Sequence, residues 1–383
     1  METVTPLGEI IEVIKESRGS AFSRCFQCGL CDSLCPWSRV RDFSMRRLVR
    51  EAAFGLIDIG SEEIWLCTTC GKCPPECPRE VKQIESGIAL RRIASEYNVF
   101  HNTSKPVRTV RGSLSGEGNP FNEKREKRSA WTDGLSVKSF VRGMEILYFP
   151  GCYPCYDPRL KKVAQATAKI LERAGVSFGI LGERENCCGE SIRKTGDEEM
   201  FIRLAKENIK TFIDHDVKRI LVTSPHCYHT FRNEYPEFSA HFEIVHIAQY
   251  LFEIVNAGRL EIRGKYPGKV TYHDPCYLGR HNNIFDEPRE LLRKIPGLEL
   301  VEMAESHKNS LCCGGGGGRI WMETPRGQRF SEIRMEQAIQ TGAEELVTCC
   351  PYCIAMFEES RISMGADDKI RVKDITEIIE EVI

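Results

Sequence analysis

The sequence has no long uncharged apolar run and no excess of charge of one sign. No segment approaches the roughly 18 consecutive apolar residues that a membrane-spanning helix needs. The formal net charge of −2 gives no reason to expect nucleic acid or an anionic membrane surface as a partner. The first twenty residues mix charged side chains with Ile and Val and contain no signal-peptide core. We therefore expect a cytoplasmic protein without a direct membrane span, in which any membrane association runs through a partner.

Cysteine, by contrast, is abundant. The 383 residues include 19 cysteines, and disulfides explain them poorly because the cytosol keeps thiols reduced. The cysteines also fall into tight, spaced groups, whereas cysteines buried only for packing would be scattered. Metal ligation or redox catalysis is therefore the expected use.

The first hundred residues contain one cysteine motif twice. Both copies have the spacing C-x2-C-x2-C-x3-C-P, in which three thiolates hold one cluster and the fourth reaches the other cluster, as in bacterial ferredoxins. The spacing predicts one cubane [4Fe–4S] cluster on Cys25, Cys28, Cys31 and Cys77, and a second on Cys67, Cys70, Cys73 and Cys35. A pair of zinc knuckles is the alternative, but zinc needs only two C-x2-C brackets per ion and no trailing Cys-Pro.

Helical patterns accompany these motifs. An apolar stripe predicts a short helix within Met1–Gly19, formed by Ile10, Ile11, Val13 and Ile14. Between the motifs, a second helix has Met45, Leu48, Val49, Ala52, Ala53 and Leu56 on one face. Its opposite face carries Arg46, Arg47 and Arg50, which either dock an acidic partner or, as favoured here, form a solvated surface. These helices predict an α-helical ferredoxin module over residues 1–100.

Residues 101–142 lose this periodicity and are rich in Gly, Ser, Pro and charge. A stretch of this length is either a domain linker or a segment that lies over the next domain. The basic run from Lys124 to Arg128 is expected to be solvated. Phe121, Trp131 and Phe140 indicate that other parts of the segment pack down.

Residues 143–262 and 263–383 contain two versions of one unit. Each has a β-type run that ends near a Pro-Cys turn, then a Cys-Cys-Gly sequence, then a second β-type run that enters a Pro-x-Cys turn. The strand–helix alternation predicts βαβ units with the cysteines at the carboxyl ends of strands. In the second version, five cysteines can hold an iron–sulfur cluster with one ligand to spare: Cys276, Cys312, Cys313, Cys350 and Cys353.

The first version is incomplete, because Ser224 stands where the second version has Cys350. An added Cys155 still leaves five thiols: Cys152, Cys155, Cys187, Cys188 and Cys227. They form either a further cluster site or a vestigial structural site. Cys349 fits no ligand position and is expected to be a buried spectator.

Several other residues lie near the candidate ligands. The run Gly314–Gly318 lacks the Gly-Lys-Ser/Thr of a phosphate loop, so its expected role is steric, allowing backbone N–H groups to approach a cluster and leaving a face open to substrate. Another group consists of either structural residues or substrate contacts and proton donors: His273, His281, Arg280, Arg319, His226 and His229. His229 could also supplement the ligands of the first version.

At these motifs the chain resembles the catalytic-subunit family of heterodisulfide reductases in its fused form, over nearly its whole length. The motifs that carry the resemblance are CFQCGLCDSLCP, CTTCGKCPPECP and the two Cys-Cys-Gly repeats. The resemblance implies an α-helical ferredoxin module followed by an α/β domain of two CCG repeats. It also implies that the complete second repeat binds a noncubane [4Fe–4S] cluster at which disulfides are reduced.

Two functions are therefore expected. The first is an iron–sulfur oxidoreductase of anaerobic metabolism, acting alone or as a subunit. It passes electrons through two cubane clusters to a noncubane cluster that reduces a disulfide, a persulfide or a sulfur carrier. The alternative is a non-catalytic electron-transfer subunit. It would link a flavoprotein, dehydrogenase or ferredoxin-type donor to a membrane quinone or cytochrome subunit.

Overall fold

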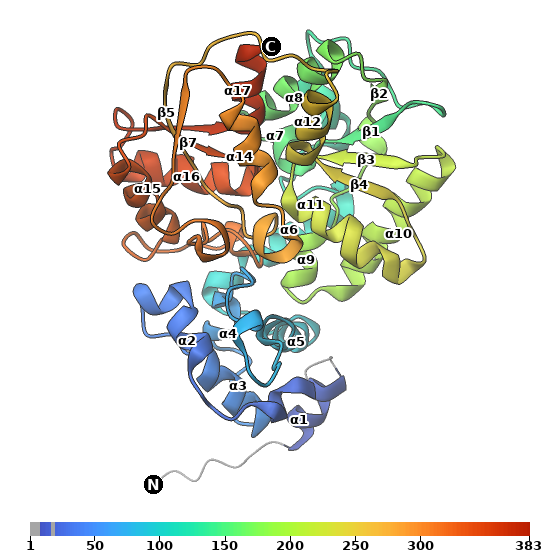
Figure 1. Ribbon diagram of the computed structural model, residues 1–383. Helices are drawn as coiled ribbons and strands as arrows, with labels where there is room; N and C mark the ends of the chain where they lie inside the picture. The colour runs from blue at the N-terminus through green and yellow to red at the C-terminus, as the bar shows by residue number, and fades with distance from the viewer. Residues whose placement is uncertain (1–7, 17–19) are drawn as a thin grey trace. The chain divides into compact units, whose positions relative to one another are not determined.

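The computed structural model describes residues 8–16 and 20–383 (Figure 1). The predicted N-terminal helix is observed as α1 (Gly8–Ile14), and the rest of its predicted range, residues 1–7 and 17–19, lies outside the described residues. The chain forms two compact units. The first comprises Met1–Thr109, Ser191–Met200 and Gly314–Phe330, and the second comprises Val110–Glu190, Phe201–Cys313 and Ser331–Ile383. The unit with the ferredoxin motifs therefore also takes in the segments that follow each Cys-Cys pair.

The N-terminal part of the first unit is helical. Its elements are α1, η2 (Ser20–Arg24), α2 (Leu30–Leu34), η3 (Pro36–Arg39), α3 (Met45–Ala53), α4 (Glu63–Leu66), η4 (Pro74–Glu76), α5 (Gln83–Glu96) and η5 (Asn102–Ser104). Helix α3 begins after Ser44, whose hydroxyl accepts the N–H of Arg47. It buries the predicted face except at Ala53 and Leu56. The prediction is wrong for Leu56, which is 40% exposed, because the helix ends before Gly55 at a positive φ of 67°.

The second unit contains two four-stranded parallel sheets with the same strand order, β2-β1-β3-β4 and β6-β5-β7-β8. The strands of the first sheet are β1 (Ile146–Phe149), β2 (Phe178–Gly179), β3 (Arg219–Val222) and β4 (Glu243–His246). Those of the second are β5 (Gly268–Tyr272), β6 (Leu298–Val301), β7 (Glu345–Thr348) and β8 (Arg371–Asp374). The central strands β1 and β7 are buried along their whole length, as in parallel sheets covered on both faces. The predicted internal repeat and α/β fold class are confirmed.

Helices alternate with these strands. Around the first sheet they are α7 (Cys152–Tyr156), α8 (Lys161–Arg173), η7 (Gly182–Arg184), α9 (Glu190–Lys194), α10 (Glu198–Asp214), α11 (Pro225–His229), η8 (Thr230–Glu234), η9 (Tyr235–Phe238) and α12 (Ile247–Asn256). Around the second they are α13 (Gly279–Asn282), α14 (Asp286–Arg293), η10 (His307–Asn309), η11 (Arg319–Trp321), α15 (Phe330–Gln340), α16 (Pro351–Ser363) and α17 (Ile375–Val382). Helix α8 packs against α17 and α12 against α14, and Figure 1 shows these four helices between the sheets. The two repeats therefore meet through their helices.

The segment 101–142 is more ordered than its composition predicts. It contains α6 (Pro106–Glu117) and η6 (Arg125–Thr132). The expectation that its aromatic residues pack down is confirmed for Trp131 and Phe140, which are buried, whereas Phe121 is half-buried. The expectation that the basic run is solvated is wrong for Arg128, which is 1% exposed. In residues 8–16 and 20–383, no helix is both long enough and apolar enough to cross a membrane.

Candidate iron–sulfur sites

The two ferredoxin motifs share an unusual backbone conformation. Gln27 and Thr69, at equivalent positions, have φ of 66° and 51°, and the equivalent glycines Gly29 and Gly71 have φ of 86° and 75°. Alternation of right-handed and left-handed residues turns successive N–H groups toward one concave side, which suits an anionic iron–sulfur cluster. In the second loop the N–H of Thr69 also donates to Cys67 Sγ at 3.4 Å. Both loops therefore fit a thiolate-bound cluster.

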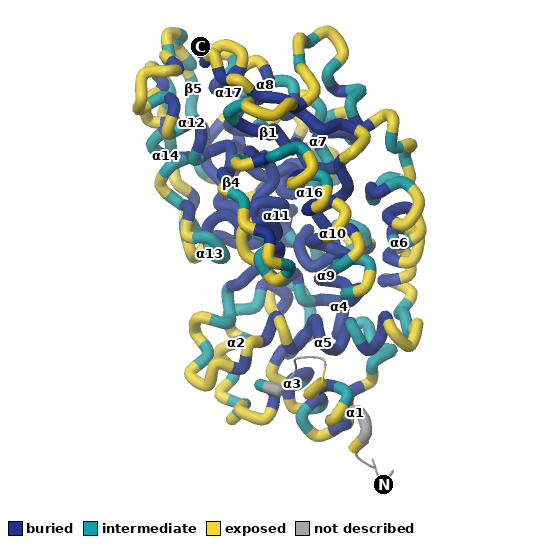
Figure 2. Tube along the Cα trace, turned by 90° about the vertical axis from the view of Figure 1, so that its right-hand side faces the viewer, coloured by how far each residue is buried: buried dark blue, intermediate teal, exposed yellow. Residues whose placement is uncertain are grey.

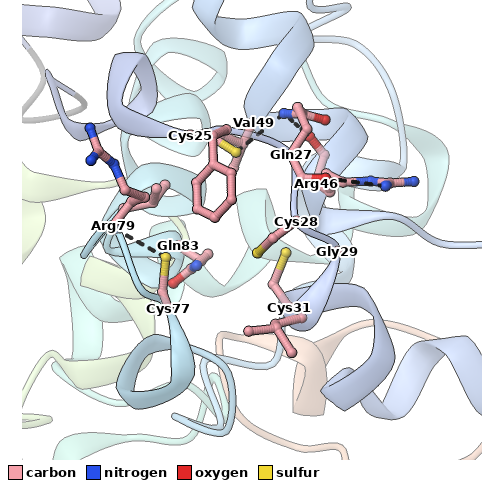
Figure 3. Close-up of a pocket in the computed structure, with 13 residues that line it drawn as sticks. Cys25, Gln27, Cys28, Gly29, Cys31, Arg46, Val49, Cys77, Arg79 and Gln83 are labelled. Atoms are coloured by element: carbon pink, nitrogen blue, oxygen red, sulfur yellow. Dashed lines mark hydrogen bonds between the residues drawn. The ribbon is translucent and has the colours of Figure 1, made fainter.

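The first group of cysteines surrounds one pocket. Cys25, Cys28, Cys31 and Cys77 line it, and Figure 3 shows their sulfur atoms around a shared space. Burial, and then the nearby Asp32, raise the pKa of the Cys31 thiol to about 12. Cys28 is exposed, so this group lies close to solvent.

The second group takes Cys35 away from its own motif. Burial first, and then the neighbouring thiols of Cys70 and Cys67, raise the pKa of Cys35. Burial likewise raises the pKa of Cys73, followed by Cys67, Cys70 and Cys35. Crowded, buried thiols ionise together only when cations lie among them, as the iron ions of a cluster do. The structure thus brings together the four residues that the crossed motif logic assigns to the second cubane.

The loop of the second group packs against the glycine run that follows Cys313. A Cβ atom on Gly316 would collide with the carbonyl oxygen of Thr68, and one on Gly317 would lie 2.5 Å from the carbonyl oxygen of Cys67. Gly317 also has a φ of +64°, which disfavours any other residue. The steric role predicted for these glycines therefore includes close approach to the ferredoxin loop.

Arg91 on α5 holds this contact in place. Its side chain is fully buried, and its guanidinium donates to the carbonyl oxygens of Ile64 at 2.7 Å, Cys67 at 2.6 Å, Gly317 at 2.9 Å and Lys194 at 3.0 Å. Four carbonyls on one guanidinium join α5, the second cysteine loop and the segments that follow both Cys-Cys pairs. Sequence reasoning missed this residue, and the only available signal was an arginine on a mostly apolar helix.

The five cysteines of the second repeat gather at the carboxyl ends of β5 and β7. All five are buried. Cys276 lies within hydrogen-bonding reach of Cys312, and Cys350 within reach of Cys353. The Cys353 and Cys313 sulfur atoms are 3.4 Å apart. The structure therefore brings the predicted set together.

These thiols differ in their ionisation. The hydrogen bond with Cys312, and then burial, raise the pKa of Cys276 well above its ordinary value. Burial opposes ionisation of Cys350 too, yet hydrogen bonds from Cys353 and from His226 lower its pKa to about 5. His226 belongs to the first repeat, on α11, which Figure 2 shows as buried. In the described ranges, no three His, Cys, Asp or Glu side chains converge closely enough to hold a single metal ion, and cluster ligands are spaced more widely.

The thiols of the first repeat form a chain of contacts. Cys187 lies within hydrogen-bonding reach of both Cys152 and Cys188, and Cys188 lies within reach of Cys227. The Ser224 hydroxyl hydrogen-bonds Cys227, in the place that Cys350 takes beside Cys353 in the second repeat. Five buried thiols thus remain grouped there, with Cys155 beside Cys152.

A buried cation accompanies the first-repeat thiols. Arg128 places Nη1 3.6 Å from Cys152 Sγ and Nε 3.1 Å from Glu185 Oε2, and both charged side chains are 1% exposed. Burial lowers the pKa of Arg128, but Cys155, Cys152 and Glu185 outweigh it and raise that pKa above its ordinary value. The sequence could not indicate this pair, since 57 residues separate its members.

Other flagged residues have structural partners. His273 Nδ1 accepts from Arg334 Nε at 3.2 Å, and burial, followed by Arg334, holds the pKa of His273 well below its usual range. Arg280 donates to two carbonyl oxygens of the loop before the second Cys-Cys pair. Arg319 lies over the Trp37 ring, 5.4 Å from its centre.

Cys349 is buried at the end of β7. Its sulfur lies 2.9 Å from the Tyr272 hydroxyl. That contact suits the spectator role, which stays a prediction.

Known families match most of this architecture. The model of the 4Fe-4S dicluster domain matches residues 21–81, and that of the cysteine-rich domain matches residues 146–232 and 270–358. One subunit of the dihydromethanophenazine:CoB–CoM heterodisulfide reductase of Methanosarcina barkeri is 29% identical over 392 residues, which cover 94% of this chain and 93% of that relative. The chain belongs to this iron–sulfur family. All 19 cysteines fall inside the three matched ranges.

Longer relatives share the same core. The "Probable iron-sulfur-binding oxidoreductase FadF" of Bacillus subtilis is 36% identical over 334 residues, covering 84% of this chain and 47% of that protein. The "EtfAB:quinone oxidoreductase" of Syntrophomonas wolfei is 33% identical over 337 residues, covering 84% of this chain and 46% of that protein. The chain spans about half the length of these two relatives.

Proposed function

We propose that this protein is an iron–sulfur oxidoreductase that passes electrons through two cubane [4Fe–4S] clusters to a noncubane [4Fe–4S] cluster, which reduces a disulfide or persulfide. The residues that would hold the noncubane cluster are Cys276, Cys312, Cys313, Cys350 and Cys353. The observation that carries the proposal is the convergence of five buried thiols from three loops at one edge of a sheet.

The contacts of the helical unit support an order for the two cubane groups. The loop of Cys67 touches the glycine run whose first residue, Gly314, is bonded to Cys313. The pocket around Cys28 lies close to solvent and is flanked by Phe26, which is 59% exposed. Electrons would therefore enter at the group around Cys28 and leave from the group around Cys67.

The reaction takes two electrons and two protons per disulfide, breaks one sulfur–sulfur bond and releases two thiols. A thiolate-held iron with an open position supplies a soft acceptor for a substrate sulfur. The chain itself would provide burial and the N–H groups of the glycine run around that sulfur.

The test is a Cys313→Ala variant assayed anaerobically with a reduced viologen dye and a panel of disulfides. We expect turnover to vanish while the electron paramagnetic resonance (EPR) signals of the two cubanes persist. A matched control is Cys349→Ala, since Cys349 is equally buried beside Cys350 and contacts Tyr272. Turnover retained by Cys313→Ala would refute the proposal.

A second candidate is a non-catalytic conduit between a flavoprotein and a quinone-linked partner. It is favoured by Ser224 in the first repeat and by similarity to a relative named EtfAB:quinone oxidoreductase. It predicts no disulfide turnover by wild-type protein, but rapid reduction of its clusters by a reduced electron-transferring flavoprotein.

A further inference from the structure

The two cysteine-rich repeats exchange aromatic side chains across their interface. Tyr153 and Tyr277 each follow the first cysteine of their repeat, and His226 and Tyr352 each precede the last cysteine of the Pro-x-Cys turn. Tyr153 packs on Tyr352 with ring centres 4.6 Å apart, and Tyr277 packs on His226 at 4.1 Å. Equivalent positions thus pair across the interface in both directions.

This symmetry is broken where the chemistry differs. The residue that the first repeat presents to the second is a histidine, and the one presented in return is a tyrosine. His226 packs on the Tyr352 ring at 4.4 Å and hydrogen-bonds the Cys350 thiol. In the first repeat the position equivalent to Cys350 is Ser224, whose hydroxyl bonds within its own repeat to Cys227. The first repeat therefore lacks one thiol and supplies a donor to its counterpart.

The histidine ring is held in one orientation. Its Nδ1 lies 3.1 Å from Oε2 of Glu190, and the two side chains are 6% and 1% exposed. Glu190 follows the Cys-Cys-Gly sequence of the first repeat and begins α9. With Nδ1 facing the carboxylate and both ring faces covered, Nε2 is the nitrogen left for Cys350.

We propose that His226 of the first repeat positions and donates a hydrogen bond to Cys350, and that this bond raises the reduction potential of the second-repeat cluster. The inference rests on the cluster of the proposed function. A donor at a ligating sulfur withdraws electron density and favours the reduced cluster, so loss of the donor makes reduction harder. The incomplete repeat thereby acts on the complete one.

The experiment is an EPR-monitored redox titration of the full chain with its clusters, under anaerobic conditions. His226→Phe keeps a ring between Tyr277 and Tyr352 but removes the donor. We expect the second-repeat cluster to be reduced about tenfold less readily, which is about 59 mV for one electron, with both cubanes unchanged. His226→Gln retains a donor and should recover part of the shift.

A matched control is His229→Gln on the same helix. His229 contacts Asn233 and the rings of Tyr277 and His281. We expect no shift from this variant. If His226→Phe leaves the potential unchanged, or if His229→Gln shifts it equally, the inference is overturned while the proposed function stands. A wild-type protein without a third cluster signal would overturn the proposed function and this inference together.

Discussion

The buried ion pair of Arg128 and Glu185 gives the sharpest test of the structure outside the cluster chemistry. Both side chains are 1% exposed, and their closest charged atoms are 3.1 Å apart. Arg128→Met would leave Glu185 buried beside an apolar side chain, with its pKa already raised by burial. Breaking a buried pair in this way costs about 3–5 kcal/mol. We expect the free energy of unfolding to fall by about that amount.

The double variant Arg128→Met with Glu185→Gln separates the cost of the orphaned charge from the value of the pair. It removes both charges and keeps an oxygen that can accept the N–H of Leu181, as Glu185 Oε1 does at 3.1 Å. Replacing a buried pair by neutral groups is often close to neutral, so we expect the double variant to regain most of the lost stability.

Lys127→Met is the matched control. Lys127 is next to Arg128 and also forms an ion pair, with Glu123 at 2.8 Å, but the two side chains are 61% and 44% exposed. Its loss should cost less than about 1 kcal/mol. Urea midpoints, measured anaerobically on protein with its clusters and compared at a common slope, give the differences. If Arg128→Met costs no more than Lys127→Met, or if the double variant is as unstable as the single one, the reasoning is refuted.

Two further predictions concern backbone space and pH. Gly317→Ala should lower the thermal midpoint and perturb the EPR signal of the cubane on the Cys67 loop, because its Cβ would lie 2.5 Å from the Cys67 carbonyl oxygen. Gly327→Ala has a similar φ of +78° and no atom within 4 Å of its Cβ, so only the conformational cost of about 1–2 kcal/mol should appear; equal effects would contradict the packing argument. His246 accepts the N–H of Ala248 at Nδ1, and burial lowers its pKa to about 3, below the unfolded value of about 6.5. Its contribution is complete above pH 6.5 and is lost as pH falls toward 3, so wild-type stability should drop by roughly 3 kcal/mol more than that of His246→Asn by pH 4, as urea unfolding at each pH would show.

Local sequence determined the ferredoxin loops and the strand pattern. Three ligands of each cubane come from one tight loop, so spacing alone assigns them, and Gly29 and Gly71 stand where the loops need left-handed backbone. The β-type runs before the cysteine turns form the central strands, because apolar runs of that length suit a parallel sheet covered on both faces. The crossing of Cys35 to the second group also followed from the motif.

Helix α6 was beyond sequence reasoning. Its sequence contains Gly112, Ser113, Ser115 and Gly116, which have weak helical propensity. Tertiary packing overrides that weakness, since Leu114 is buried. Composition therefore indicated a linker where the fold has a helix.

Only the tertiary structure decided which charged and polar side chains serve the cysteines. Arg128, Arg91 and His226 have no local signature, because each finds its partner through packing with segments far away in the chain. A basic run or a single histidine reads the same whether solvated or buried, since the free energy of burying it depends on the partner that meets it. The cysteine spacing thus determined where clusters can be held, while the fold decided which donors and cations surround them.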